Sequence, residues 1–300
     1  RQFIDAETVF LAVAKAKKAG AEVRGSMFWR ELRGKSTLIR TSASSAQKSL
    51  GPRSTETEAI YASFMARKKS AEERLKALKA QLATQQRLNR ALRVGRVPNV
   101  VVGVLNALES MGVQEHFMVV GTHALYAYET AAGVRINEAA MATRDVDILF
   151  DTRKHIAFVT AMKKLDSSLI GVLRKVDPSF EVVEDQLYTA RNQDGFEVDI
   201  IRRERTDDDP HPIKLSEADE DFWVAQARRA SVLLDSPGFS AVIVATNGTM
   251  ARMDTVHPAT FATFKRWLAG QPDRDPLKRR RDVLQADAVQ VLLEQYLPQV

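Results

Sequence analysis

The chain of 300 residues contains no cysteine. This absence excludes disulfide bonds, cysteine nucleophiles and zinc sites built from thiolates. Long apolar runs are also missing, since no stretch approaches the roughly 20 apolar residues that cross a bilayer. The first residues lack the basic and apolar regions of a secretory signal. We therefore expect a cytoplasmic protein with no membrane partner.

Negative charge is scarce in the first third of the chain. Residues 1–97 hold 8 Asp and Glu against 21 Lys and Arg, a net charge of +13, whereas residues 98–300 hold 30 against 23, a net charge of −7. One interpretation is that the basic third attracts a polyanion while the acidic remainder carries carboxylate chemistry. The alternative is that these lysines and arginines form a solvated helical surface.

The basic third has the pattern of a helical region with a hairpin. With 45% hydrophobic residues the chain is globular. We expect a helix that ends near Gly20, a hairpin of residues 27–32 and 36–41, and a serine-rich loop over residues 42–55. Residues 56–92 predict one long helix, whose apolar stripe indicates packing or a homodimer.

A break at residues 95–98, Gly-Arg-Val-Pro, marks the predicted domain boundary. We expect a basic N-terminal region over residues 1–97, a catalytic core over 98–205 and a C-terminal part over 206–300 that completes the site. The core should contain strands at 117–120, 146–150, 186–191 and 196–201. Asn247-Gly248 predicts a further hairpin, and helices should follow at 258–269 and 276–297.

Two aspartates one residue apart carry the strongest chemical signal. Asp145 and Asp147 lead into an apolar strand, and a side-chain period of two puts both on one face. Such a pair with a third carboxylate can hold two Mg²⁺ ions for phosphoryl transfer. Asp199 also lies inside an apolar strand and is the candidate third ligand. Its alternative is an edge-strand surface residue.

Three other acidic clusters lie at 207–209, 219–221 and 273–275. Their neighbours are Pro, Glu and Arg, so they are interpreted as solvated turns or helix caps. The histidines show no metal-ligand spacing, although His123 could touch a substrate. The basic run 278–281 predicts an exposed helix face or a guide for nucleic acid.

A turn upstream predicts a phosphate site. The apolar strand 117–120 runs into Gly121-Thr122 and then into a helix. Glycine permits close backbone approach, threonine can cap, and the helix N-terminus is positive.

Together these motifs resemble the DNA polymerase β-like nucleotidyltransferase superfamily, whose pattern is strand, glycine turn, helix, Asp-x-Asp and a later Asp. Thr122 replaces the commoner second small residue. The helices around His257 to Lys265 and Arg280 to Ala286 resemble a bacterial stand-alone branch related to AbiE-type toxin nucleotidyltransferases. The toxins have a glutamate where Phe264 precedes the lysine here. The resemblance implies an α/β (α+β) fold with a mixed sheet and helical terminal parts.

The resemblance also implies roles for individual residues. Asp145 and Asp147 would ligate two Mg²⁺ ions, and Asp199 would ligate one of them and act as general base. Gly121 and Thr122 would seat the triphosphate of an NTP substrate. Lys265 would neutralise phosphate charge, with an exposed helix lysine as the alternative. Arg144 is a further candidate for nucleotide binding, with packing on the opposite sheet face as its alternative.

The leading hypothesis is a Mg²⁺-dependent nucleotidyltransferase that moves NMP from an NTP to an acceptor and releases pyrophosphate. RNA or tRNA, met by residues 1–97, is favoured over protein or a small molecule, and a toxin role would follow only by analogy. The rival hypothesis is a catalytically silent nucleic-acid-binding or regulatory module on the same scaffold.

Overall fold

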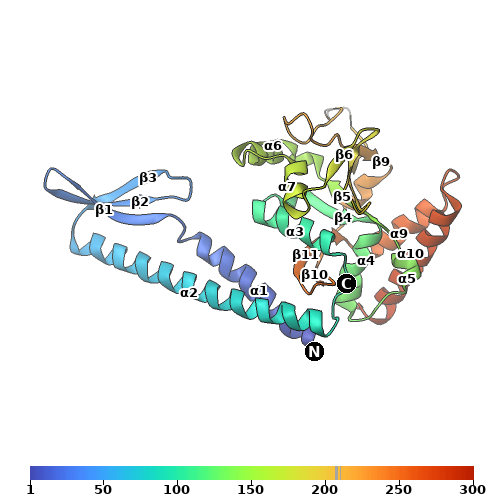
Figure 1. Ribbon diagram of the computed structural model, residues 1–300, viewed down its shortest axis with the longest axis horizontal. Coiled ribbons are helices and arrows are strands. Elements are labelled where there is room, and N and C mark those ends of the chain that lie inside the picture. The colour runs from blue at the N-terminus through green and yellow to red at the C-terminus, as the bar shows by residue number, and fades with distance from the viewer. Residues whose placement is uncertain (207–208, 210) are drawn as a thin grey trace. The chain divides into compact units, whose positions relative to one another are not determined.

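The computed structural model describes residues 1–206, 209 and 211–300. The chain divides into two compact units, Arg1–Val94 and Gly95–Val300 (Figure 1). Each unit is described by itself. Among the described residues, no helix is long and apolar enough to span a membrane.

The N-terminal unit combines two helices with a small sheet. Helix α1 (Gln2–Ala21) packs along the long helix α2 (Thr55–Ala91), and strands β1 (Ser26–Leu32), β2 (Lys35–Thr41) and β3 (Gln47–Pro52) form an antiparallel sheet in that order (Figure 1). The predicted helices and hairpin are confirmed. The predicted loop over residues 42–55 is wrong, because β3 lies within it. Its polar sequence has no alternation, and pairing with β2 makes it a strand.

The sheet of this unit packs on one end of α2. Met27 and Leu38 meet Phe64 of α2 in a small core, and Arg40 stacks its guanidinium 4.4 Å from the Phe64 ring centre. Helix α2 begins at a capping box, in which Ser54 and Thr57 bond to each other's backbone N–H.

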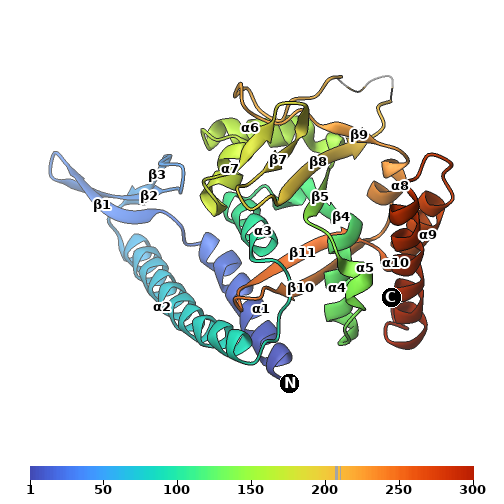
Figure 2. The same ribbon diagram turned by 45° about the vertical axis from the view of Figure 1, so that its right-hand side comes forward.

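The C-terminal unit is built on one mixed sheet. The strands are β4 (Phe117–Val120), β5 (Asp145–Phe150), β6 (Glu181–Val183), β7 (Gln186–Arg191), β8 (Glu197–Arg203), β9 (Ala225–Ala227), β10 (Gly238–Val244) and β11 (Met250–Val256). Their order is β10-β11-β4-β5-β8-β7-β6, with β9 beside β8. Strands β4, β5 and β8 lie side by side at the centre of the sheet (Figure 2). Strand β5 runs antiparallel to β4 and parallel to β8.

Helices surround this sheet. They are α3 (Asn99–Met111), α4 (Ala124–Ala132), α5 (Glu138–Met141), α6 (His155–Lys164), α7 (Leu169–Val176), α8 (Ala230–Leu234), α9 (Pro258–Ala269) and α10 (Pro276–Gln295). Helices α3 and α7 pack together, and α9 packs on α10, which also meets α4 and α5 (Figure 2). The mixed sheet with helices at both ends confirms the predicted α/β class. The sequence did not predict α5, α6, α7, α8, β6 or β9.

Candidate active site

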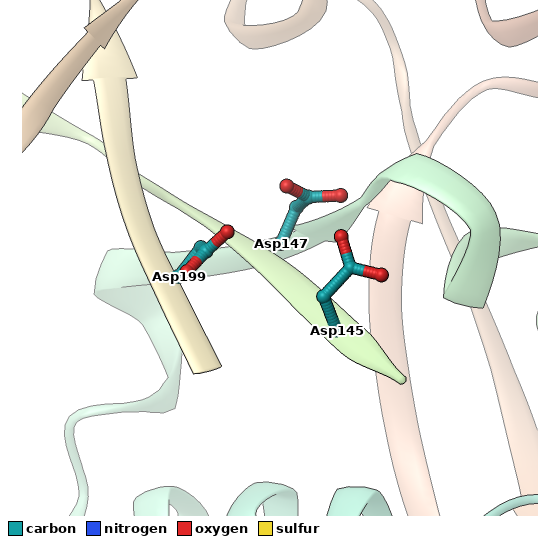
Figure 3. A group of neighbouring side chains, drawn as sticks. All are labelled: Asp145, Asp147 and Asp199. Atoms are coloured by element: carbon teal, nitrogen blue, oxygen red, sulfur yellow. The ribbon is translucent and has the colours of Figure 1, made fainter. Parts of the chain in front are cut away.

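Three carboxylates converge at the centre of the sheet. Asp145 and Asp147 lie on the same face of β5, and Asp199 lies directly beside Asp147 on β8. One ligand atom from each of the three lies within 4.8 Å of the others, and Figure 3 shows the side chains facing one space. Residues more than 50 positions apart in the chain are thus joined by the parallel pairing of two strands.

Threonine hydroxyls orient two of the carboxylates. Thr189, on β7 opposite Asp199, is fully buried and donates a 2.6 Å hydrogen bond to Asp199 Oδ1. Thr143 donates a hydrogen bond to Asp145 Oδ1. Among the described residues, neither carboxylate accepts a hydrogen bond at its second oxygen. The sequence motifs gave no signal for either threonine.

The cluster brings together the negative charge of three half-buried carboxylates. Burial and the neighbouring Asp145 raise the pKa of Asp147 to about 7, although Lys265 opposes the rise. Burial also raises the pKa of Asp199, which the hydrogen bond from Thr189 partly offsets. Carboxylates that repel each other in this way form a site for a hard cation, because a cation neutralises them without a proton.

The glycine turn lies against this cluster. Gly121 begins a 3₁₀ turn (Gly121–His123) between β4 and α4, with a φ of +66°. A Cβ atom at this position would lie 2.1 Å from Oδ2 of Asp147. Only glycine therefore permits both the left-handed backbone and the approach of the carboxylate.

Thr122 in the same turn is buried and held from a distant helix. Its hydroxyl accepts a 3.0 Å hydrogen bond from Nε2 of Gln285 on α10, and the same amide nitrogen donates at 2.7 Å to the carbonyl of Ala140. Gln285 is completely buried. The turn is thus fixed to α10 and α5, and the role of Gln285 was not predicted from the sequence.

A model of the nucleotidyltransferase family matches residues 99–300. The chain belongs to this family. The match covers the whole mixed sheet, the carboxylate cluster and the two closing helices. Searches of curated proteins and of solved structures found no match. Transferase activity in general follows from the family, while the AbiE-related branch is not identified by this match.

In this nucleotidyltransferase, Lys265 is buried and not an exposed helix lysine. Its ammonium group lies 2.9 Å from Asp282 of α10, and Arg274 also pairs with Asp282 at 2.7 Å. Burial lowers the pKa of Lys265, which the charges of Asp282 and Asp147 oppose. The positive charge of Lys265 therefore interacts both with Asp282 and with Asp147 of the carboxylate cluster.

Arg144 lines a cavity whose lining residues include none of the three carboxylates. It is exposed, and it shares this cavity of about 710 Å³ with Phe196 and several amide side chains. Its backbone carbonyl accepts a hydrogen bond from the backbone N–H of Glu197, which joins the residue before β5 to the first residue of β8.

His123 is buried beside the cluster. Its ring packs against Tyr126 and Phe196, and burial lowers its pKa to about 4. The ring is therefore neutral at physiological pH. Nδ1 is buried and has no hydrogen-bond partner among the described residues.

Lys278 and Asp221 make interactions that the sequence did not predict in detail. Lys278, from the basic run at the start of α10, opposes the rise in pKa of both Asp147 and Asp199, so this exposed side chain belongs to the site's electrostatics. Asp221 is buried, not solvated, and caps α7 by accepting from the backbone N–H groups of Leu169 and Ile170. Asp275 caps α10 as predicted. Asp207 and Asp208 lie outside the described residues.

Proposed function

We propose that this protein transfers a nucleoside monophosphate from an NTP to an RNA acceptor and releases pyrophosphate. The observation that carries the proposal is the convergence of Asp145, Asp147 and Asp199 within 4.8 Å in a chain of the nucleotidyltransferase family. A polyanionic substrate could approach three carboxylates only if cations came with it. The NTP would bring these cations, because it would bind as its Mg²⁺ complex.

We propose that the three carboxylates hold two divalent ions. All three donors are carboxylates, the ligands that Mg²⁺ accepts, and burial together with the charge of Asp145 raises the pKa of Asp147 to about 7. Asp145 and Asp147 would hold both ions, and Asp199 would hold one. When bound, such ions stabilise charge on the attacking and leaving oxygens of an in-line displacement.

The remaining steps belong to the chain's own groups. The acceptor hydroxyl oxygen would bond to the α-phosphorus, its proton would pass to Asp199, and the bond to the pyrophosphate oxygen would break. Oδ1 of Asp199 accepts a hydrogen bond from Thr189, which fixes the orientation of the carboxylate that would receive this proton. Gly121 and Thr122 would seat the triphosphate, and Lys265 and Lys278 would supply positive charge.

RNA or tRNA is the proposed acceptor because of the charge in the N-terminal unit. Residues 1–94 hold 20 Lys and Arg against 8 Asp and Glu, which favours a polyanion. We also assign the chain to the toxin-related stand-alone branch on the residues around Lys265 and Asp282. We further propose that the enzyme acts on RNA in the cytoplasm. It would do so as a monomer or as a dimer through α2.

The test compares Asp199→Asn with wild-type protein in two assays. Binding of Mg²⁺-NTP should stay within about tenfold, because Asp145 and Asp147 remain. Pyrophosphate release in the presence of RNA should fall by roughly 10²- to 10⁴-fold, because the general base is lost. Asp185→Asn, at an exposed turn outside the cluster, is the matched control and should behave as wild type.

A catalytically silent module predicts a different result. The wild type would bind nucleotide or RNA but release no pyrophosphate with any acceptor. Equal release from wild type and Asp199→Asn would instead remove Asp199 from the site.

A further inference from the structure

A groove lies between the two packed helices of the N-terminal unit, α1 and α2. It has a volume of about 480 Å³ and is lined by residues of α1 and α2. Three of these residues are cations, namely Lys15 of α1 and Arg67 and Arg74 of α2, and all three are exposed. The other lining residues are alanines and one serine, so the groove has small side chains between long charged ones.

Helix geometry explains this arrangement. Arg67 and Arg74 are seven residues apart, which is close to two turns, so both side chains lie on one face of α2. Ser70 and Ala71 fall between them on the same face and leave the space open. Lys15 approaches from α1 on the other side.

None of the three cations has a hydrogen bond or an ion pair within the described part of the chain. Lys68, next to Arg67, shows the contrast, since its ammonium group donates at 2.7 Å to the carbonyl of Gly25 and lies 4.0 Å from Glu72. Three unpaired positive charges around one concave space repel each other. An anion between them would remove that repulsion.

We propose that this groove binds the phosphate backbone of the RNA acceptor, an inference that rests on the proposed function and gives it a docking site. Arg67 and Arg74 are about 10 Å apart along the helix axis. At roughly 3.4 Å per phosphate along one strand, this distance spans about three nucleotides. The two guanidinium groups can therefore bind different phosphates of the same strand.

The shape of the groove favours a polynucleotide over an anionic membrane. A lipid headgroup layer is flat and would touch only the rim, whereas a strand can lie between the helices and meet cations from both sides. Guanidinium groups also match phosphate oxygens in a bidentate geometry.

The experiment measures RNA binding by the full chain without NTP or metal. The groove variant is Lys15→Gln/Arg67→Gln/Arg74→Gln. The control variant, Lys69→Gln/Lys76→Gln/Arg90→Gln, also removes three charges, but at exposed positions of α2 outside the groove lining. A labelled single-stranded RNA oligonucleotide is titrated at several KCl concentrations.

The groove variant should lose about tenfold or more in affinity at low salt. Its slope of log affinity against log salt should become shallower by about 2, because three phosphate contacts contribute roughly 0.7 each. The control variant should keep most of the affinity and most of the slope. Thermal unfolding should show that both variants fold, and single Arg67→Gln and Arg74→Gln variants, which should each show part of the loss, replace the triple variant if it does not fold.

Equal losses in both variants would mean that diffuse charge binds RNA, and this would overturn the proposal. It is overturned too if the groove variant binds RNA normally but loses binding to vesicles of phosphatidylcholine and phosphatidylserine. Because the assay contains neither NTP nor metal, it succeeds or fails independently of pyrophosphate release, which tests the proposed function.

Discussion

At the scale of single residues, Gly121 links backbone conformation to the carboxylate cluster. Gly121→Ala would put a methyl group 2.1 Å from Oδ2 of Asp147 and would strain a backbone at φ +66°. A displacement of about 1 Å in such a site typically costs on the order of 10² in rate. We expect Mg²⁺-dependent pyrophosphate release to fall at least that far, measured under saturating NTP.

Gly133 provides the matched control for this change. It ends α4 at φ +68°, yet nothing lies within 4 Å of an added Cβ. Both alanine variants should lose roughly 1 kcal/mol of unfolding free energy through backbone strain. Only Gly121→Ala should lose activity. Equal losses of activity in the two variants would show that strain, and not crowding of Asp147, is responsible.

The raised pKa of Asp147 predicts that the stability of the metal-free protein depends on pH. Burial and then Asp145 raise its pKa from the ordinary 3.8 to about 7. For an acid raised in this way, stability falls as the pH increases above about 4, and the loss is complete above about 7. Asp147→Asn removes the ionisation, so the variant should be more stable than wild type at pH 8, by at most about 4 kcal/mol.

Urea unfolding with a chelator present measures this difference. The advantage of Asp147→Asn should be smaller at pH 5 than at pH 8, and excess Mg²⁺ should shrink it at pH 8. The same variant should release no pyrophosphate. A stability difference that is constant from pH 5 to pH 8 would contradict the raised pKa.

At the scale of elements, Asp282 joins the two closing helices. Its fully buried carboxylate pairs with Lys265 and Arg274, whereas Asp287 of the same helix pairs with Arg266 at an exposed position. Removing one partner of a buried ion pair leaves an uncompensated charge, which costs roughly 3–5 kcal/mol. An exposed pair contributes about 1 kcal/mol or less.

We therefore expect Asp282→Ala to lower the unfolding free energy by several kcal/mol and Asp287→Ala to change it little, both measured by urea unfolding. The two changes remove the same charge from the same helix pair. Similar small effects in both variants would mean that water reaches Asp282 and that Lys265 is not held by it.

The elements also show what the sequence could predict. Strand β5 was predictable because Asp145 and Asp147 lead into an unbroken apolar run, and the β10–β11 hairpin because Asn247-Gly248 suits its turn. Strand β3 was not, since its polar residues become a strand only by pairing with β2. Helix α7 was not predicted although its buried Leu169, Ile170, Val172 and Leu173 recur at helical spacing, so here the sequence carried a signal that was missed.

The candidate site, too, could be predicted only in part from the sequence. The carboxylates carry a local motif, so their convergence could be anticipated from strand periodicity. Gln285 reaches Thr122 across 163 positions, and Thr189 reaches Asp199 from a neighbouring strand. Such contacts depend on tertiary packing, and no fixed spacing in the sequence signals them.

At the scale of the whole molecule, charge is divided between the two units. The C-terminal unit, residues 95–300, holds 30 Asp and Glu against 24 Lys and Arg, and its three clustered carboxylates would repel a nucleic-acid backbone. If RNA is the acceptor, as proposed, its attraction would come from residues 1–94. The family match begins at residue 99, so the chemistry belongs to the other unit.

The last prediction separates these two contributions by expressing residues 95–300 alone. This unit has its own extensive core, so circular dichroism should show a folded protein. Its affinity for Mg²⁺-NTP should stay within about tenfold of the full chain. Its affinity for RNA at moderate salt should fall by about 10² or more, and the salt slope should nearly vanish because the phosphate contacts are gone. If the isolated unit kept the full RNA affinity and slope, the acceptor would bind within the acidic unit, and the basic helices would be only a solvated surface.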